Sequence, residues 1–381
     1  MIPDTPVAGA TARPVRDRRG LRAFVELPYL LHGDDPHFVP PLRGECRSLL
    51  DRRRNPFFSY GDAELFTVTA GGRVAGRVAA VHNPRHNAAH GGRDGFFGQF
   101  ACADDPAVAA ALLGAAARWA RERGLTSLAG PVNFTMNDEC GLLVDGFGER
   151  PAVMMPYNPP YYRDLLEGCG LRKAKDLWAW RRGPHPLGER LARVAERARR
   201  RHGLTVRPLD GRRFTADIDR VKHVYNDVWR HNWGFTPMTD AEFAATARRL
   251  RSVIDPRLIQ LAEAGGEPVG VALVLPDLNE ALPAARGRLT TWGLPIGLLR
   301  LARAARHVRR TRAVLFGVVE RLRGQGVEAV LYAAAYDAIR ARGPVDCELS
   351  WTLEDNDAVN RYLAADGCVR TKTYRIYRRD L

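Results

Sequence analysis

The stretch TRAVLFGVVERLRGQGVEAVLYAAAYDAIRARG (311–343) carries the sharpest local signal in this sequence of 381 residues. An apolar β-like run leads into the loop RGQG (323–326), and an alanine-rich helical pattern follows and ends at Gly343. Glycines in such a loop let backbone N–H groups turn toward an anion, and the helix N-terminus adds partial positive charge. The stretch therefore predicts a strand, a pyrophosphate-binding loop and a helix, although two glycines serve a plain left-handed turn equally well.

The residues that follow complete a longer order of elements. ELSWTLEDNDAVNRYLAADG (348–367) predicts a strand, a short helix led by an asparagine and a closing glycine, and TKTYRIYRR (371–379) predicts a final strand. This order of strand, RGxG loop, helix, strand, Asn-led helix and strand resembles the GNAT superfamily of acyl-CoA N-acyltransferases. The resemblance implies an acyl-CoA co-substrate, no tightly bound cofactor and no metal.

The resemblance also assigns roles to individual residues. The set that it implies for binding acyl-CoA is Val318, Arg323, Gly324, Gln325, Gly326 and Asn356. Glu328 stands where the family usually has Gly or Ala, and its carboxylate would repel a pyrophosphate unless it points away. The tyrosine that often protonates the leaving thiolate falls at Leu363, so we assign this role to Tyr362, one residue earlier. Glu348 stands where family members often keep a general base, and a salt bridge to an arginine is the equally weighted alternative.

The first half of the chain repeats the order more faintly. A hairpin around Gly71-Gly72 and the helix PAVAAALLGAAARWARERG (106–124) recur, but the loop before that helix carries two acids, Asp104 and Asp105, and no glycine. We therefore expect no ordinary CoA binding there. The predicted fold is α/β (α+β), with two tandem GNAT-like domains, each a mixed, mostly antiparallel sheet flanked by helices. The predicted boundaries are a flexible tail (1–13), an N-terminal domain (14–182), a helical connector (183–203) and a C-terminal domain (204–381).

Polar and aromatic residues gather in two segments of the first half, NFTMNDECG (133–141) and MMPYNPPYY (154–162). We expect them to line a substrate pocket together with a tryptophan of the second half. The predicted pocket residues are Asn133, Asp138, Glu139, Tyr157, Tyr161, Tyr162 and Trp233. The alternative is ordinary turn chemistry for the Asn and Asp residues and core-edge packing for the tyrosines.

As a whole, GPVNFTMNDECGLLVDGF (130–147), NWGFTPM (232–238) and ELSWTLEDN (348–356) resemble a bacterial tandem GNAT-like group that includes ceramide synthase-type acyltransferases. The resemblance implies that an amine attacks a long-chain acyl thioester and forms an amide, with a sphingoid-type or other amino-lipid or metabolite amine as the acceptor. Two alternatives stay open, namely a Fem-like transferase that uses aminoacyl-tRNA, and a non-catalytic relic that binds a lipid or a carrier protein.

Charge adds a further expectation. Lys and Arg outnumber Asp and Glu by 58 to 43, which gives a net charge of +15, and only four of the basic residues are lysines. Arginines concentrate in 189–202 and in 300–312. The basic amphipathic segment 289–310 predicts peripheral contact with an anionic membrane or a roof over an acyl tunnel, with a plain surface helix as the alternative. We expect no specific nucleic-acid partner.

Remaining features place the protein in the cytoplasm by default. The sequence shows neither a secretory signal at its start nor a run of apolar residues long enough to span a membrane.

Six cysteines without a CxxC pair predict reduced, buried thiols. His82, His86 and His90 recur every four residues, but Asn83-Pro84 and the glycines that follow predict a loop here, not a zinc-binding helix.

Overall fold

The computed structural model describes residues 10–230, 232–251, 253–343 and 346–381. Contacts divide the chain into two compact units, which are described separately below. Unit 1 comprises Met1–Leu177, Ala281–Arg306 and Lys372–Leu381, and unit 2 comprises Trp178–Glu280 and His307–Thr371. Residues 1–9 of the predicted tail lie outside the described residues.

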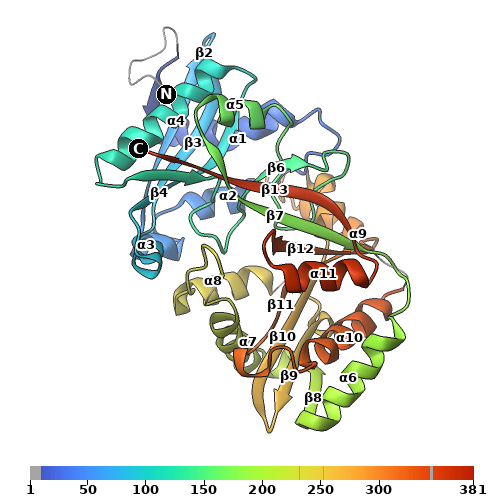
Figure 1. The fold of residues 1–381 in the computed structure, drawn as a ribbon. Coiled ribbons are helices and arrows are strands. Elements are labelled where there is room, and N and C mark those ends of the chain that lie inside the picture. Colours follow the sequence, from blue (N-terminus) through green and yellow to red (C-terminus); the bar gives the residue numbers. More distant parts are fainter. Residues whose placement is uncertain (1–9, 231, 252, 344–345) are drawn as a thin grey trace. The chain divides into compact units, whose positions relative to one another are not determined.

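Unit 1 contains a sheet flanked by helices (Figure 1). Its elements are β1 (Ala12–Pro14), α1 (Arg18–His32), α2 (Arg43–Leu50), β2 (Asp62–Ala70), β3 (Arg73–His82), α3 (Pro84–His90), β4 (Asp94–Cys102), α4 (Pro106–Arg121), β5 (Ser127–Gly130), β6 (Leu142–Asp145), α5 (Tyr162–Gly168) and α9 (Ile296–Ala305). Two long strands, β7 (Arg172–Arg182) and β13 (Val369–Asp380), have residues in both units.

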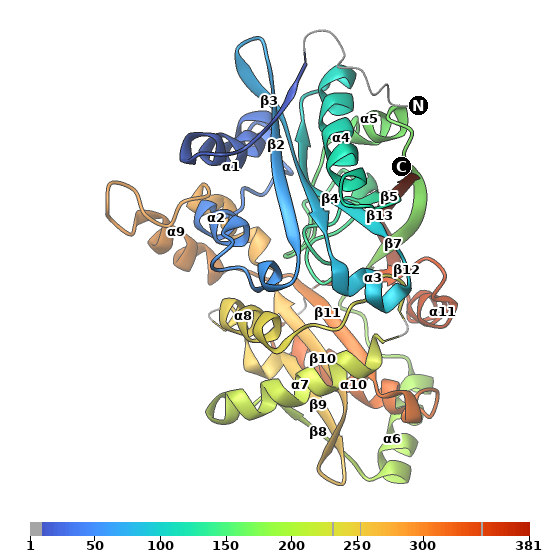
Figure 2. The ribbon, with the colours of Figure 1, turned by 90° about the vertical axis from the view of Figure 1, so that its left-hand side faces the viewer.

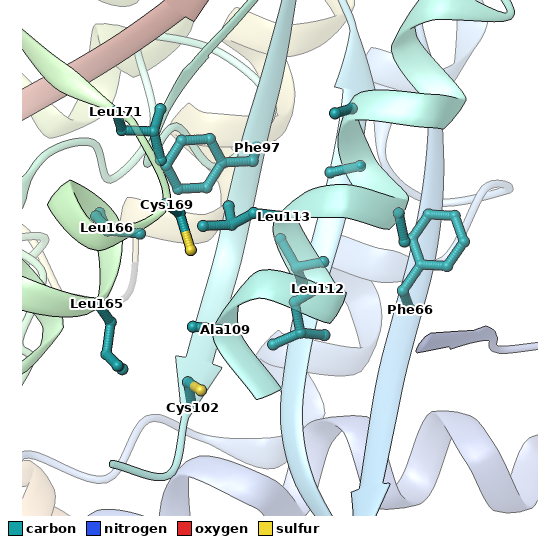
Figure 3. Packing of buried hydrophobic residues seen from close by; sticks show 14 of the residues in the cluster. Phe66, Phe97, Cys102, Ala109, Leu112, Leu113, Leu165, Leu166, Cys169 and Leu171 are labelled. Carbon is teal, nitrogen blue, oxygen red and sulfur yellow. The ribbon is translucent and has the colours of Figure 1, made fainter. Parts of the chain in front are cut away.

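The sheet of unit 1 runs in the order β1–β2–β3–β4–β5–β13, and β6 pairs with β13. Strands β1 to β4 are antiparallel, whereas β4 and β5 are parallel from Asp94↔Ser127 to Phe96↔Ala129. Helices α4 and α5 cover one face of the sheet and α1 lies on the other (Figure 2). In the core, Leu113 of α4 points toward Phe97 and α5 (Figure 3), and Leu112 packs against β3 at Gly76.

Unit 2 is built in the same way. Its elements are α6 (Glu189–His202), β8 (Leu204–Pro208), α7 (Phe214–Val228), α8 (Asp240–Leu250), β9 (Ile259–Ala264), β10 (Glu267–Pro276), β11 (Thr311–Val318), α10 (Val327–Arg340), β12 (Cys347–Leu353) and α11 (Asp357–Ala365). The strand order is β7–β12–β11–β10–β9–β8, and β11 and β12 are its parallel pair. Helix α10 packs on one face with α6 against it, and α7 lies on the other face (Figure 1).

Short 3-10 turns join several of these elements. They are η1 (Pro56–Ser59), η2 (Gly211–Arg213), η3 (Pro256–Leu258), η4 (Leu278–Glu280), η5 (Leu282–Ala285) and η6 (Glu320–Leu322). The predicted mixed α/β class, with sheets flanked by helices, is confirmed by these elements and their pairing.

The closing strand of each sheet comes from the other half of the sequence. Strand β13, at the end of the chain, pairs with β5 from Tyr377↔Gly130 to Asp380↔Ser127, and β7, from the first half, lies beside β12. The compact units therefore cross the expected boundaries at 182 and 203, and those domain boundaries stay a prediction.

The histidine segment corrects one expectation. The sequence predicts a loop at 82–90, but Pro84–His90 forms α3, because Pro84 suits the first helical turn and the Asn83 side chain accepts from His86 N–H (2.9 Å). His82 lies on β3 instead. The described residues contain no group of three or more His, Cys, Asp or Glu that could hold a metal ion. All six cysteines are free thiols, and all but Cys46 are buried.

Candidate active site

The site in unit 2 begins where two parallel strands separate. The described pairing of β11 with β12 covers only Thr311–Ala313 and Cys347–Leu349, while β11 continues to Val318 and β12 to Leu353. Where two parallel strands separate, the backbone N–H and C=O groups that faced the neighbouring strand no longer bond to it and need another hydrogen-bond partner. A substrate that lies along the end of β11 can supply it.

The RGQG loop connects the end of β11 to α10. Gly324 has φ +71° and Gly326 has φ +85°, a left-handed conformation that favours glycine, and Gly326 is the N-cap residue of α10. A Cβ at Gly326 would also lie 3.0 Å from the Ala198 Cβ and 3.1 Å from Val194 Cγ1 of α6. Gly326 thus serves the packing of α6 on α10 as well as the turn.

The polar groups of the loop have hydrogen-bond partners in the residues around it. Gly324 N–H donates to Glu328 Oε1 at 2.9 Å, so the carboxylate at the unusual position takes up an amide that would otherwise face an anion. The Arg323 guanidinium donates to the carbonyl groups of Val318 (3.2 Å) and Val228. The Gln325 side chain donates to the Arg321 carbonyl at 2.8 Å. A pyrophosphate at this loop would therefore displace Glu328 from the Gly324 amide.

Glu348 lies on β12, directly across from Arg312 of β11. The Ser350 hydroxyl donates to Glu348 Oε1 (2.8 Å) and accepts from Arg312 Nε (2.9 Å), and Arg312 Nη2 also donates to the Ser350 carbonyl (3.1 Å). Arg312 and Ser350 are both buried. This chain of hydrogen bonds holds the carboxylate in one orientation, as a positioned proton acceptor requires.

Tyr362 lies on α11, where its ring meets Tyr332 of α10 edge-on, with centroids 5.4 Å apart. Burial raises the pKa of Tyr362, so its hydroxyl keeps its proton at neutral pH. The neighbouring Leu363 is buried with Trp180 and Cys368, so the family position of the tyrosine belongs to the core here. Asn356 caps α11, and its side chain accepts from Val359 N–H at 3.4 Å.

A small apolar cavity lies between α10 and the sheet of unit 2, with a volume of about 40 Å³. Ala272, Ala313 and Leu349 contribute the sheet side, and Tyr332 and Ala335 contribute the helix side. This cavity was not predicted from the sequence. Its only signal was the small residues on adjacent strands, which could be assigned to a cavity only once the strand register was known.

A second hollow that the sequence did not predict is an open groove of about 910 Å³ beside α7. Val319, Glu320 and Arg321 line it just before the RGQG loop, and α7 supplies side chains that include Asp219, Arg220 and His223. Most of the residues that line the groove are charged, whereas the cavity beneath α10 is lined mainly by apolar side chains. It is the larger of these two spaces and lies next to the RGQG loop.

The predicted pocket residues of unit 1 mostly hold the backbone. The Asn133 side chain accepts from Gln99 N–H (2.8 Å), which ties the segment after β5 to β4, and Asp138 accepts from the Thr135 hydroxyl (2.9 Å). Glu139 is exposed. Asn133 therefore bridges the parallel strands of unit 1 where they separate.

The three tyrosines of unit 1 also have structural partners. The Tyr161 hydroxyl donates to the Cys102 carbonyl (2.8 Å), and the Tyr162 hydroxyl accepts from Cys102 N–H (2.7 Å) and lies 3.0 Å from His32 Nε2. The Tyr157 hydroxyl donates to the Asp35 carboxylate. Burial raises the pKa of Tyr161 to about 12. Trp233 belongs to unit 2, where it is partly exposed.

Two known proteins are similar to this chain in sequence along nearly its whole length. No family model matches the sequence. The chain is 36% identical to the bacterial ceramide synthase of Caulobacter vibrioides, over 99% of each chain. It is 32% identical to Protein YghO of Escherichia coli, over 97% of this chain and 95% of that protein. The chain belongs to the family of these two proteins.

A solved structure has a similar fold. The tandem GNAT protein from the clavulanic acid biosynthesis pathway matches with a TM-score of 0.56 at 13% identity, over 97% of this chain and 98% of that one. The predicted tandem GNAT fold is thereby confirmed. In each half of the chain, a strand leads into a long helix, and the strand after that helix pairs with the first strand in parallel. These elements are β4, α4 and β5 in the first half and β11, α10 and β12 in the second.

Proposed function

We propose that the protein is an N-acyltransferase that transfers an acyl group from acyl-CoA to the amine of an amino lipid of the sphingoid type. The observation that carries this proposal is the splayed β11–β12 pair, with the RGQG loop at the end of β11 and Glu348 on β12. The relative named bacterial ceramide synthase, which matches along nearly the whole chain, supports a lipid amide as the product.

The proposed reaction needs one proton acceptor and one proton donor. The amine nitrogen attacks the thioester carbonyl carbon, the C–N bond forms, and the C–S bond then breaks to release the CoA thiolate. Glu348, oriented by Ser350, accepts the proton that the amine loses. The Tyr362 hydroxyl, next to Tyr332 of α10, gives a proton to the thiolate. Backbone amides at the end of β11 polarise the thioester carbonyl.

Glu328 offers the sharpest test of where acyl-CoA binds. Glu328→Gln keeps an acceptor for Gly324 N–H but removes the negative charge from the start of α10. We expect the affinity for CoA and palmitoyl-CoA, measured by calorimetry, to rise about two- to fivefold. Asp337→Asn is the matched control, because it makes the same change of charge in the last turn of the helix and should leave the affinity unchanged. If neither the wild type nor Glu328→Gln binds palmitoyl-CoA, the acyl-CoA proposal is wrong.

An activity assay tests the transfer itself. With palmitoyl-CoA and a long-chain amine, we expect release of CoA thiol that requires the amine, and a lipid amide visible by mass spectrometry. Glu348→Gln should lower kcat by about 10²- to 10⁴-fold with little change in the KM for acyl-CoA. Glu189→Gln, on the exposed start of α6, is the control. Thiol release without an amine would identify hydrolysis and contradict the proposal.

A further inference from the structure

Residues 281–319 form a stretch without a single carboxylate side chain. The part of it that belongs to unit 1, Ala281–Arg306, contains five arginines at 286, 288, 300, 303 and 306. Elsewhere on the chain arginines commonly pair with acids, as Arg193 and Arg200 of α6 do with Glu189 and Glu196. The stretch 281–306 therefore presents positive charge that its own residues do not neutralise.

The same stretch exposes large apolar side chains at its tip. Trp292 is 93% exposed and Leu299 is 66% exposed. The exposed apolar residues between 289 and 299 are Leu289, Trp292, Leu294, Leu298 and Leu299. Single exposed apolar residues are normal on a protein surface, but a cluster of five within eleven residues indicates a surface that contacts something.

Backbone hydrogen bonds hold this tip in a defined shape. Thr291 N–H donates to the Leu294 carbonyl (2.9 Å), Leu294 N–H donates back to the Thr291 carbonyl (3.0 Å), and Leu298 N–H donates to the Leu289 carbonyl (2.9 Å). A Cβ at Gly297 would lie 1.8 Å from the Arg288 carbonyl oxygen, so glycine allows the loop to close on the start of α9. The apolar side chains are exposed on an ordered loop.

The base of the stretch is tied to the rest of unit 1. Arg43 N–H donates to the Gly287 carbonyl (3.0 Å), and its guanidinium donates to the Arg286 carbonyl (2.9 Å) while it pairs with Glu26 of α1 (2.8 Å). Figure 2 shows α9 on the same side of unit 1 as α2, where Arg43 begins the helix. The tip is thus carried on a fixed base.

Helix α9 arranges the two kinds of side chain along one face. Leu299, Ala302, Arg303 and Arg306 are all exposed, at the spacing of neighbours on a helix surface. The leucine lies at the end next to the apolar tip, and the arginines follow toward the end of the helix. An apolar tip bordered by arginines is the pattern of segments that insert shallowly into a lipid surface, with tryptophan at the level of the headgroups.

We propose that the segment Leu289–Arg306 docks on the surface of an anionic lipid bilayer, with the tip 289–299 inserted and Arg300, Arg303 and Arg306 at the headgroups. Charge complementarity selects this partner, because residues 281–306 carry five arginines and no carboxylate. No helix among the described residues is both long enough and apolar enough to cross a bilayer, so the contact is peripheral. The inference goes beyond acyl transfer and does not depend on it.

Vesicle co-sedimentation of the full chain tests the proposal. We expect binding to vesicles of phosphatidylcholine and phosphatidylglycerol, weaker binding at high salt, and little binding to pure phosphatidylcholine. Changing Arg300, Arg303 and Arg306 together to Gln should weaken binding about a hundredfold, since each arginine near such a surface contributes about fivefold. The matched control changes Arg197, Arg199 and Arg201, three exposed arginines of α6, to Gln. An equal loss in that control would mean that net charge alone drives binding, and would overturn the assignment.

The tip is tested separately. Trp292→Ser with Leu294→Ser should reduce binding, whereas Val359→Ser with Val369→Ser, which also replaces two exposed apolar residues, should not. Quenching of tryptophan fluorescence by brominated lipid should be largely lost in Trp292→Phe. Two results would overturn the proposal, namely no binding to anionic vesicles, or conversion of a dimer to a monomer by the tip variant without lipid. These assays contain no acyl donor and no amine, so their outcome is independent of the proposed enzyme activity.

Discussion

His32 illustrates how one buried polar side chain sets a property of the protein. It lies at the end of α1, 3.0 Å from the Tyr162 hydroxyl, and burial lowers the pKa of its imidazole from 6.5 to about 4. The folded state therefore keeps His32 neutral under conditions in which the unfolded chain binds a proton.

We predict that this difference makes the protein less stable in mild acid. Between pH 6.5 and about 4 the unfolded state binds the proton more readily, so the free energy of unfolding falls as the pH decreases, by about 3 kcal/mol from this residue at full effect. Urea unfolding at pH 7 and pH 5 should show a smaller pH dependence in His32→Gln than in the wild type. His90→Gln, at an exposed position on α3, should keep the wild-type dependence. Equal slopes in all three proteins would contradict the assignment.

At the scale of elements, the two long helices start in different ways. Helix α10 starts at Gly326 and has Glu328 in its first turn, whereas α4 is capped by Asp105, whose carboxylate accepts from Ala107 N–H (2.8 Å) and Val108 N–H (3.4 Å). The Asp105 carboxylate thus takes up the Ala107 and Val108 amides at the start of α4, so these two amides are not available to bind an anion from solution.

We predict that Asp105→Ala costs about 1 kcal/mol of stability, because two N–H groups of α4 lose their acceptor. Asp104→Ala changes the charge equally at an exposed neighbouring position and should cost less than about 0.5 kcal/mol. Denaturant unfolding of both variants measures the difference. Equal costs for the two variants would show that the cap is not formed in solution.

At the scale of the whole molecule, the C-terminal strand completes the sheet of unit 1. Tyr374, Ile376 and Tyr377 of β13 are fully buried there, and Arg375 pairs with Asp176 at 2.7 Å. The first half of the sequence therefore lacks a strand of its own sheet until the end of the chain has been made.

We predict that deletion of 372–381 abolishes the cooperative unfolding of unit 1, because it exposes the edge of β5 and part of the core. Thermal unfolding and limited proteolysis should show early cleavage within residues 10–177. Arg378→Ala, which keeps the strand and changes a half-exposed side chain, serves as the control. A deletion variant that melts like the wild type would show that the exchange of closing strands is not needed for folding.

The sequence by itself determined the local elements of this protein. The RGQG loop, the alanine-rich helices and the Asn356 cap depend on residues a few positions apart, so periodicity and turn chemistry were sufficient to predict them. The same local logic failed at α3, where Asn83 and Pro84 begin a helix that the sequence analysis read as a loop. Element type was thus predictable wherever one local signal dominated.

Only the tertiary structure decided how distant parts meet. The pairing of β13 with β5 follows from burying apolar side chains across the whole sheet, and no local pattern encodes it. Likewise, Glu328 bonds to the loop amide, Ser350 orients Glu348, and the hydroxyls of Tyr161 and Tyr162 bond to the backbone of Cys102. A buried polar group must find a partner, and the fold determines which one lies within reach.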